Sequence, residues 1–205
     1  MKALASYWEL TEQLLGQSLP HSIAENLIIR YAEQHRAYHT PQHLQACFAQ
    51  FEQVQDQCDH PDEVALALWF HDAIYDTHAH DNEEKSAELA VECLISQKIM
   101  PVKIERVRKL IIATKHQSSA TDNDTALLLD IDIGILGSSP SRYAQYEKQI
   151  REEYCWVPDE LYKQGRKKVL QQFLTHPSIY ASAFFKEKYE QQAQLNLRKA
   201  LSELA

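Results

Sequence analysis

The stretch ALALWFHD, residues 65–72, is the most apolar helical run in the chain and ends on an imidazole and a carboxylate. The preceding residues 61–63, PDE, are typical of a first helical turn, because proline is tolerated there and acids stabilise the positive end of a helix. A helix that is apolar all round is buried, so we expect this one to be central. We expect His71 and Asp72 to be paired or to coordinate an ion, since an unpartnered buried charge is costly. A His–Asp hydrogen bond that tethers the adjoining loop is the alternative.

The rest of the chain also carries helical periodicity. Apolar residues recur three and four positions apart at 4–15, 23–31, 44–54, 104–112, 127–136, 146–154, 161–173 and 180–204. Polar loops are expected at 76–82 and 117–124. The chain has four glycines in 205 residues, too few for a sheet joined by tight hairpins. These observations predict an all-α, single-domain protein with roughly eight to ten helices of ordinary length.

Composition and charge exclude several classes of protein. Apolar residues make up 44% and charged residues 24%, the balance of a folded globular protein rather than a disordered one. The net charge of −8 argues against binding to nucleic acid polymers or anionic membranes. Neither GxGxxG nor the P-loop pattern GxxxxGK occurs. No signal peptide, membrane-spanning run or CxxC pair is found, so we expect a cytoplasmic protein.

Two histidines lie four residues apart in YHTPQH, residues 38–43. On a helix, His39 and His43 would share one face about one turn apart. Because Pro41 lies between them, the helix must begin near it, and His39 can lie just before the first turn. For this pair by itself, side chains that simply face solvent are the alternative.

Two acids interrupt the apolar run LLLDIDIGIL, residues 127–136. Asp130 and Asp132 cannot share one face of a helix, so we expect only one to point inward, and one of them could instead cap a helix. One of these acids, together with His43 and the His71–Asp72 pair, gives two imidazoles and two carboxylates from three helices. Such a set suits a divalent Mn, Mg, Fe, Co or Zn ion. No cysteine joins the set, so a structural zinc site is not expected.

The order His43, then His71 and Asp72, then a distant Asp132 resembles the HD superfamily of metal-dependent phosphohydrolases, an all-helical fold defined by such a ligand set. YHTPQH is similar to the YHxxxH element of the cyclic-nucleotide phosphodiesterases in that superfamily. This resemblance implies that His43 is a metal ligand and that His39 protonates the leaving group.

Two further segments extend the resemblance. DIDIGILG, residues 130–137, resembles the element that holds the last ligand, which implies Asp132 as the ligand and Asp130 as its neighbour. HDAIYDT, residues 71–77, resembles the HDxxEDT element of the guanosine tetraphosphate hydrolases. Asp76 matches their Asp and is carried over as a catalytic residue, whereas Tyr75 stands where they have Glu.

The likeness to small bacterial predicted HD-domain phosphohydrolases runs from about residue 36 to the C-terminal helix, and includes the stretches 81–87 and 150–154. It implies one HD-type domain over 1–205, with a metal-site core at about 31–136 and C-terminal helices at 139–204 packed on it. It also implies hydrolysis of a phosphomonoester or phosphodiester of a small, nucleotide-like substrate by a metal-activated water. The alternatives are a non-catalytic metal- and nucleotide-binding regulatory module, and a helical interaction protein in which the HD pair is only a tether.

Several nearby residues complete the expected site. Glu83 is a candidate base, although acids in a first turn also simply stabilise the helix. His116 is a candidate ligand for a second metal, or a partner of the negative end of its helix. Arg36 is the best candidate to bind phosphate, in a set of cations that also includes Lys85, Lys115, Arg151 and Arg166. Apolar residues of the last helix could form core or a homodimer seam.

Overall fold

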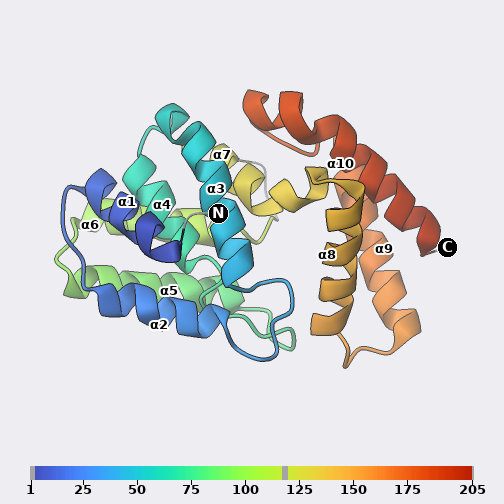
Figure 1. The fold of residues 1–205 in the computed structure, drawn as a ribbon, viewed down its shortest axis with the longest axis horizontal. Helices are drawn as coiled ribbons and strands as arrows, with labels where there is room; N and C mark the ends of the chain where they lie inside the picture. Colours follow the sequence, from blue (N-terminus) through green and yellow to red (C-terminus); the bar gives the residue numbers. More distant parts are fainter. Residues whose placement is uncertain (1–2, 117–119, 205) are drawn as a thin grey trace. The chain divides into compact units, whose positions relative to one another are not determined.

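The computed structural model of the chain describes residues 3–116 and 120–204, and over these its regular elements are all helical (Figure 1). In chain order they are α1 (Leu4–Leu15), α2 (His21–Tyr31), α3 (Pro41–Val54), η1 (Gln55–Gln57), α4 (Pro61–Phe70), α5 (Asn82–Ser96), α6 (Pro101–Ala113), α7 (Asn123–Asp132), η2 (Ile133–Gly137), α8 (Pro140–Glu153), α9 (Asp159–Thr175) and α10 (Ala183–Glu203). The ten α-helices of the described chain confirm the predicted all-α fold.

The helices fall into two compact units, residues 1–131 and 132–205. The boundary lies inside a continuous helix, because α7 ends at Asp132. The expectation of a single domain with its C-terminal helices packed on the metal-site core stays a prediction. Of the polar loop expected at 117–124, residues 117–119 lie outside the described residues.

The apolar helix α4 is the centre of the first unit, as its sequence predicts. It contacts α1, α2, α3, α5 and α6, and every residue from 62 to 70 is buried. Trp69 lies edge-on to Trp8 and against Phe48, and its indole N–H donates to Thr11 Oγ1 over 3.0 Å. This packing on all sides fixes the position at which α4 ends, and therefore the position of the residues that follow it.

Charged side chains anchor the start of α4. The acids of its first turn, Asp62 and Glu63, are buried and form ion pairs with Lys103 and Arg106 of α6. Just before the helix, the Asp124 carboxylate of α7 accepts hydrogen bonds from the backbone N–H groups of residues 59 and 60 over 2.7 and 2.9 Å. The acids therefore connect α4 to α6 and to α7, in addition to stabilising the positive helix end.

In the second unit, η2 lies close against α10. A Cβ atom built on Gly137 would come 2.5 Å from Cβ and 2.9 Å from the carbonyl oxygen of Tyr189, so only glycine fits there without a shift. The Asn196 amide also donates to the carbonyl oxygens of Leu136 and Ser138, over 2.8 and 2.9 Å. The last helix was expected from Tyr180 but begins at Ala183, after a segment whose backbone N–H groups bind the Glu190 carboxylate.

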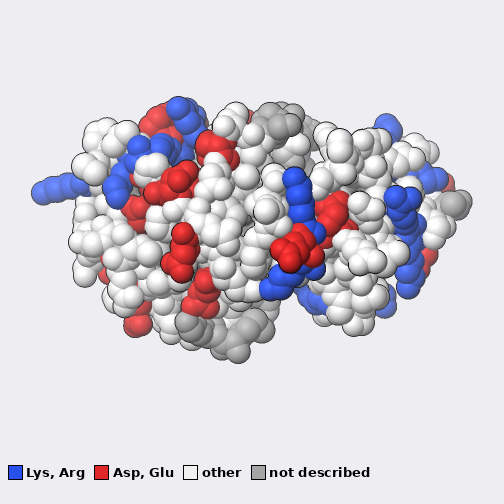
Figure 2. Space-filling view, turned by 90° about the horizontal axis from the view of Figure 1, so that it is seen from above, with Lys and Arg blue, Asp and Glu red and all other residues white. Residues whose placement is uncertain are grey.

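Charged side chains of both signs are interspersed on the face shown in Figure 2. Among the described residues, no helix combines the length and the apolar character needed to cross a membrane.

Replacing Gly137 with alanine is expected to lower the free energy of unfolding by about 1–3 kcal/mol, because the added methyl group overpacks the contact with α10. Gly165→Ala is the matched control. Its added Cβ would meet nothing within 4 Å, and it lies within α9, so it should raise the free energy of unfolding by up to about 1 kcal/mol. Denaturant unfolding of both variants measures the difference; equal effects would contradict the close contact.

Candidate metal centre

His71 directly follows α4 and is 1% exposed. Its Nδ1 lies 2.8 Å from the carbonyl oxygen of Leu68, one turn earlier. A carbonyl only accepts hydrogen bonds, so Nδ1 carries the proton and donates it. In the neutral ring, Nε2 then carries a lone pair, the arrangement in which an imidazole binds a metal.

Asp72 places a carboxylate beside this lone pair. Its Oδ2 lies 3.2 Å from His71 Nε2 and 3.5 Å from His43 Nε2. Burial alone would raise the pKa of Asp72, but the two neighbouring imidazoles outweigh it and hold that pKa well below its usual range. Behind the pair, the Tyr31 hydroxyl accepts the Asp72 backbone N–H over 3.3 Å; burial raises the pKa of Tyr31 to about 12, so it stays protonated.

His43 supplies the third atom from another helix. Pro41 begins α3, which puts His43 in the first turn, where it is buried against the ring of Tyr38. Its Nε2 lies 3.2 Å from His71 Nε2. Two atoms that bind one ion at about 2.0–2.2 Å stand about 3 to 3.5 Å apart, and the three separations around this triangle fall in that range.

Asp132, the last residue of α7, completes this group. One ligand atom each from His43, His71, Asp72 and Asp132 lie within 4.8 Å of one another. Asp130, two residues earlier, is buried but does not belong to the group. The structure thus brings together the four residues that the sequence selected, from the starts or ends of three helices.

A cysteine lies in the same cluster, contrary to the prediction that none would. Cys47 is buried one turn after His43 on α3, and its Sγ lies 3.6 Å from His43 Nε2. His43, Cys47 and His71 form a second group of atoms within 4.8 Å of one another. The spacing of four residues, which puts His43 and Cys47 on one face of a helix, is the sequence signal for this contact, but a buried thiol is equally typical of a small hydrophobic residue.

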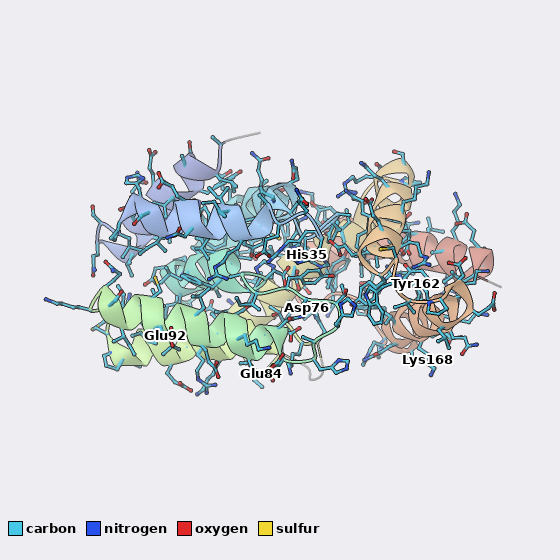
Figure 3. The ribbon with its side chains drawn as sticks, turned by 90° about the horizontal axis from the view of Figure 1, so that it is seen from below. His35, Asp76, Glu84, Glu92, Tyr162 and Lys168 are labelled. Atoms are coloured by element: carbon cyan, nitrogen blue, oxygen red, sulfur yellow. The ribbon has the colours of Figure 1, made fainter. Side chains whose placement is uncertain are left out.

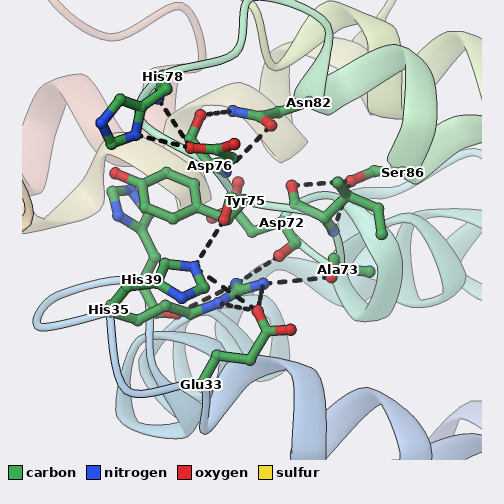
Figure 4. Close-up of polar contacts among 12 residues, drawn as sticks. Glu33, His35, His39, Asp72, Ala73, Tyr75, Asp76, His78, Asn82 and Ser86 are labelled. Atoms are coloured by element: carbon green, nitrogen blue, oxygen red, sulfur yellow. Dashed lines mark hydrogen bonds and ion pairs between the residues drawn. The ribbon is translucent and has the colours of Figure 1, made fainter.

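Arg36 holds the turn after α4 in place, and Figure 4 labels its partners Glu33, His39, Asp72 and Ala73. Its Nη1 donates to the carbonyl oxygens of Asp72, over 2.6 Å, and of His39, over 3.4 Å, and its Nη2 donates to that of Ala73 over 3.2 Å. Nε and Nη2 also donate to the Glu33 carboxylate, at 3.2 and 3.0 Å. A guanidinium has five N–H donors and these contacts use all of them, so the buried Arg36 clamps backbone instead of presenting its charge to a phosphate.

His39 lies beside the cluster. Its ring centroid is 4.2 Å from that of Tyr75 and 5.6 Å from that of His43, and the side chain is partly exposed. On the other side, His35 Nε2 lies 2.7 Å from the Tyr75 carbonyl oxygen. Tyr75, which replaces the Glu of the similar element, therefore packs against the candidate proton donor.

Asp76 organises the loop after the cluster and lies outside both ligand groups. Its exposed carboxylate accepts hydrogen bonds from the backbone N–H and Nδ1 of His78, over 2.9 and 3.1 Å, and these bonds lower its pKa. Asn82 bonds to both backbone groups of Asp76, and Ser86 bonds to both backbone groups of Ile74. Figure 3 labels Asp76 in this loop, together with His35 and Glu84.

The acids that begin α5 differ from each other. Burial and the charge of Asp72 raise the pKa of Glu83, although Lys115 opposes this, so its carboxyl lies within the field of the cluster. Glu84 forms an ion pair with Lys115, and Lys85 forms one with Asp81 over 2.8 Å.

His116, the candidate ligand for a second metal, lies at the end of α6 with a left-handed backbone, φ 52°. Its backbone N–H donates to the Ala113 carbonyl oxygen over 3.0 Å. It belongs to neither ligand group found in the described residues.

Comparisons with models of known protein families, with curated proteins and with solved structures find no match to this chain.

Replacing Arg36 with lysine is expected to lower the free energy of unfolding by about 1–3 kcal/mol, because one ammonium cannot reach Glu33 and the three carbonyl groups together. The matched control is Arg108→Lys, which affects an exposed ion pair with Glu105 on α6 and should change stability by less than about 0.5 kcal/mol. Denaturant unfolding of both variants measures the difference, and equal stabilities would contradict the clamp.

Proposed function

We propose that this protein is an HD-type, metal-dependent phosphohydrolase acting on a small, nucleotide-like phosphate ester. The single observation that carries the proposal is the convergence of His43 Nε2, His71 Nε2 and Asp72 Oδ2, which lie 3.2 to 3.5 Å apart in a buried place. The order of these residues, with Asp132 after them, is the order that the resemblance to the HD superfamily implies.

The convergence favours a cation over a purely structural pair. His71 directs a lone pair, and Asp72 a carboxylate, toward the same point, and two acceptors cannot bond to each other. Either a proton on an imidazole or a bound cation must lie between them. The group adds a second imidazole and, in Asp132, a second carboxylate, which is more than a single shared proton requires.

The donor set suits a borderline or hard divalent ion, since imidazole and carboxylate ligands bind Mn, Fe, Co, Zn and Mg. The two carboxylates of Asp72 and Asp132 would balance the charge of such an ion. A divalent ion held there would supply Lewis-acid chemistry, which activates water and polarises a phosphoryl oxygen.

We assign proton transfer around this centre to two residues of the chain. His39 is partly exposed and its ring lies beside that of His43, and we assign it the protonation of the leaving oxygen. Glu83, with its raised pKa and its carboxyl in the field of Asp72, can accept a proton from the attacking water. A pKa moved toward neutrality suits such a role.

The positively charged side chains near the cluster already bind groups of the protein, and this favours a second candidate function. The Arg36 guanidinium is used by backbone and Glu33, while Lys85 and Lys115 bind acids of the protein. A phosphate would have to displace these partners or rely on the metal for its charge balance. Turnover also needs cations to stabilise the charge that develops in the transition state, which binding does not. Occupied cations therefore weaken the case for catalysis more than the case for binding, and a regulatory module that binds metal and nucleotide without turnover is the alternative.

The deciding experiment measures metal content and phosphate release together. Metal-stripped protein receives Mn, Mg, Fe(II), Co or Zn separately and is incubated with a panel of nucleotides and simple phosphate esters. We expect metal-dependent turnover, and we expect Asp72→Asn to lose it and to bind metal at least about 10-fold more weakly.

Asp56→Asn is the matched control, because this exposed acid of η1 belongs to neither ligand group. It should retain both metal binding and turnover. Metal binding without turnover across the panel would support the regulatory module. Full metal occupancy in Asp72→Asn would sink the ligand assignment.

His39→Asn is expected to keep its metal and to lose rate by about 10²–10⁴-fold, the usual contribution of a general acid. His21→Asn, at the exposed start of α2, is the control for the same chemical change. Metal analysis and kcat on both variants test the role. If His39→Asn lost its metal, His39 would be a ligand instead of a proton donor.

A further inference from the structure

Cys47 gives the candidate centre a donor that neither the proposed hydrolysis nor the resemblance uses. The thiol is buried on α3, one turn beyond His43, and belongs with both imidazoles to a group whose ligand atoms lie within 4.8 Å of one another.

The separation of sulfur and nitrogen is that of two ligands on one ion. Sγ lies 3.6 Å from His43 Nε2. A zinc ion binds thiolate at about 2.3 Å and imidazole at about 2.0–2.1 Å, so the two donors of a tetrahedral ion stand about 3.5 Å apart. The Nε2 atoms of His43 and His71, 3.2 Å apart, also match two ligands of one ion.

We propose that His43, His71 and Cys47 form a sulfur-containing ligand set for a thiophilic divalent ion such as Zn²⁺, Cd²⁺ or Co²⁺. The inference rests on the proposed metal site and deepens it. As the ion binds, the thiol releases its proton to solvent and the thiolate lone pair forms the new bond, with no change of oxidation state.

The two ligand sets share both imidazoles and differ in their third donor. The carboxylates of Asp72 and Asp132, which suit Mg²⁺ and Mn²⁺, complete one group; the Cys47 sulfur, which suits softer ions, completes the other. A change of ion therefore changes which group is used. Thiophilic ions compete with Mg²⁺ and Mn²⁺ for the shared imidazoles, and an ion bound to Cys47 does not use the carboxylates.

The test uses the whole protein loaded with Co²⁺, because a thiolate bound to Co²⁺ produces a charge-transfer absorption in the near ultraviolet. We expect this band in the wild type and its loss in Cys47→Val, which keeps the volume and apolar character of the site. We also expect Cd²⁺ affinity to fall about 10-fold or more in this variant, and Mn²⁺ affinity to change by less than about 3-fold.

Cys93→Val is the matched control, since this half-buried thiol on α5 belongs to neither ligand group and its loss should leave the band unchanged. Circular dichroism verifies that each variant is folded. Should Cys47→Val fail to fold, the ¹¹³Cd resonance of the wild type decides, because a sulfur ligand shifts it downfield of its position with nitrogen and oxygen ligands alone.

Two results overturn the inference in distinguishable ways. Co²⁺ bound without the band, or with a band that survives Cys47→Val, would exclude Cys47 as a ligand. It would leave the proposed centre of His43, His71, Asp72 and Asp132 intact. No Co²⁺ binding by the wild type, and none of Mn²⁺, would overturn the sulfur-containing set and the proposed metal site together.

Discussion

The hydrogen bond from His71 Nδ1–H to the Leu68 carbonyl governs the chemistry of the centre. It fixes the tautomer of the ring, and it does so at the end of a helix whose neighbours surround it on all sides. The lone pair of His71 Nε2 is therefore directed into the cluster, toward the atoms of His43 and Asp72 that lie 3.2 Å from it. Without this bond, Nε2 could carry the proton and donate it to Asp72, and the pair would be complete in itself.

The cluster joins segments that lie far apart in the chain, and buried polar groups hold those segments together. Asp124 connects α7 to the start of α4, and Ser86 connects α5 to the turn that follows α4. Arg36, which follows α2 in the chain, connects its segment to the same turn. Asp124, Ser86 and Arg36 all bond to backbone groups, so hydrogen bonds to the main chain help to fix the relative positions of these segments.

The sequence predicts those parts of the site in which polar or charged residues interrupt an apolar run. A helix as apolar as α4, ending on His71 and Asp72, predicts its own burial and the need of those side chains for a partner. The role of Arg36 could not be predicted in this way, because its acceptors are backbone carbonyls, which every residue has. Cys47 is hard to identify as a donor from the sequence for a different reason: a thiol resembles a small hydrophobic side chain until its neighbours are known.

Because Arg36 binds backbone groups, it places little constraint on the side chains of the turn after α4. The carbonyl oxygens of residues 39, 72 and 73 are the same whichever side chains those positions carry. The hydrogen bonds of Arg36 therefore do not depend on which side chains the turn carries. Substitutions of those side chains leave the acceptors of Arg36 in place, so the backbone of this turn can persist while the side chains that it presents to the cluster change.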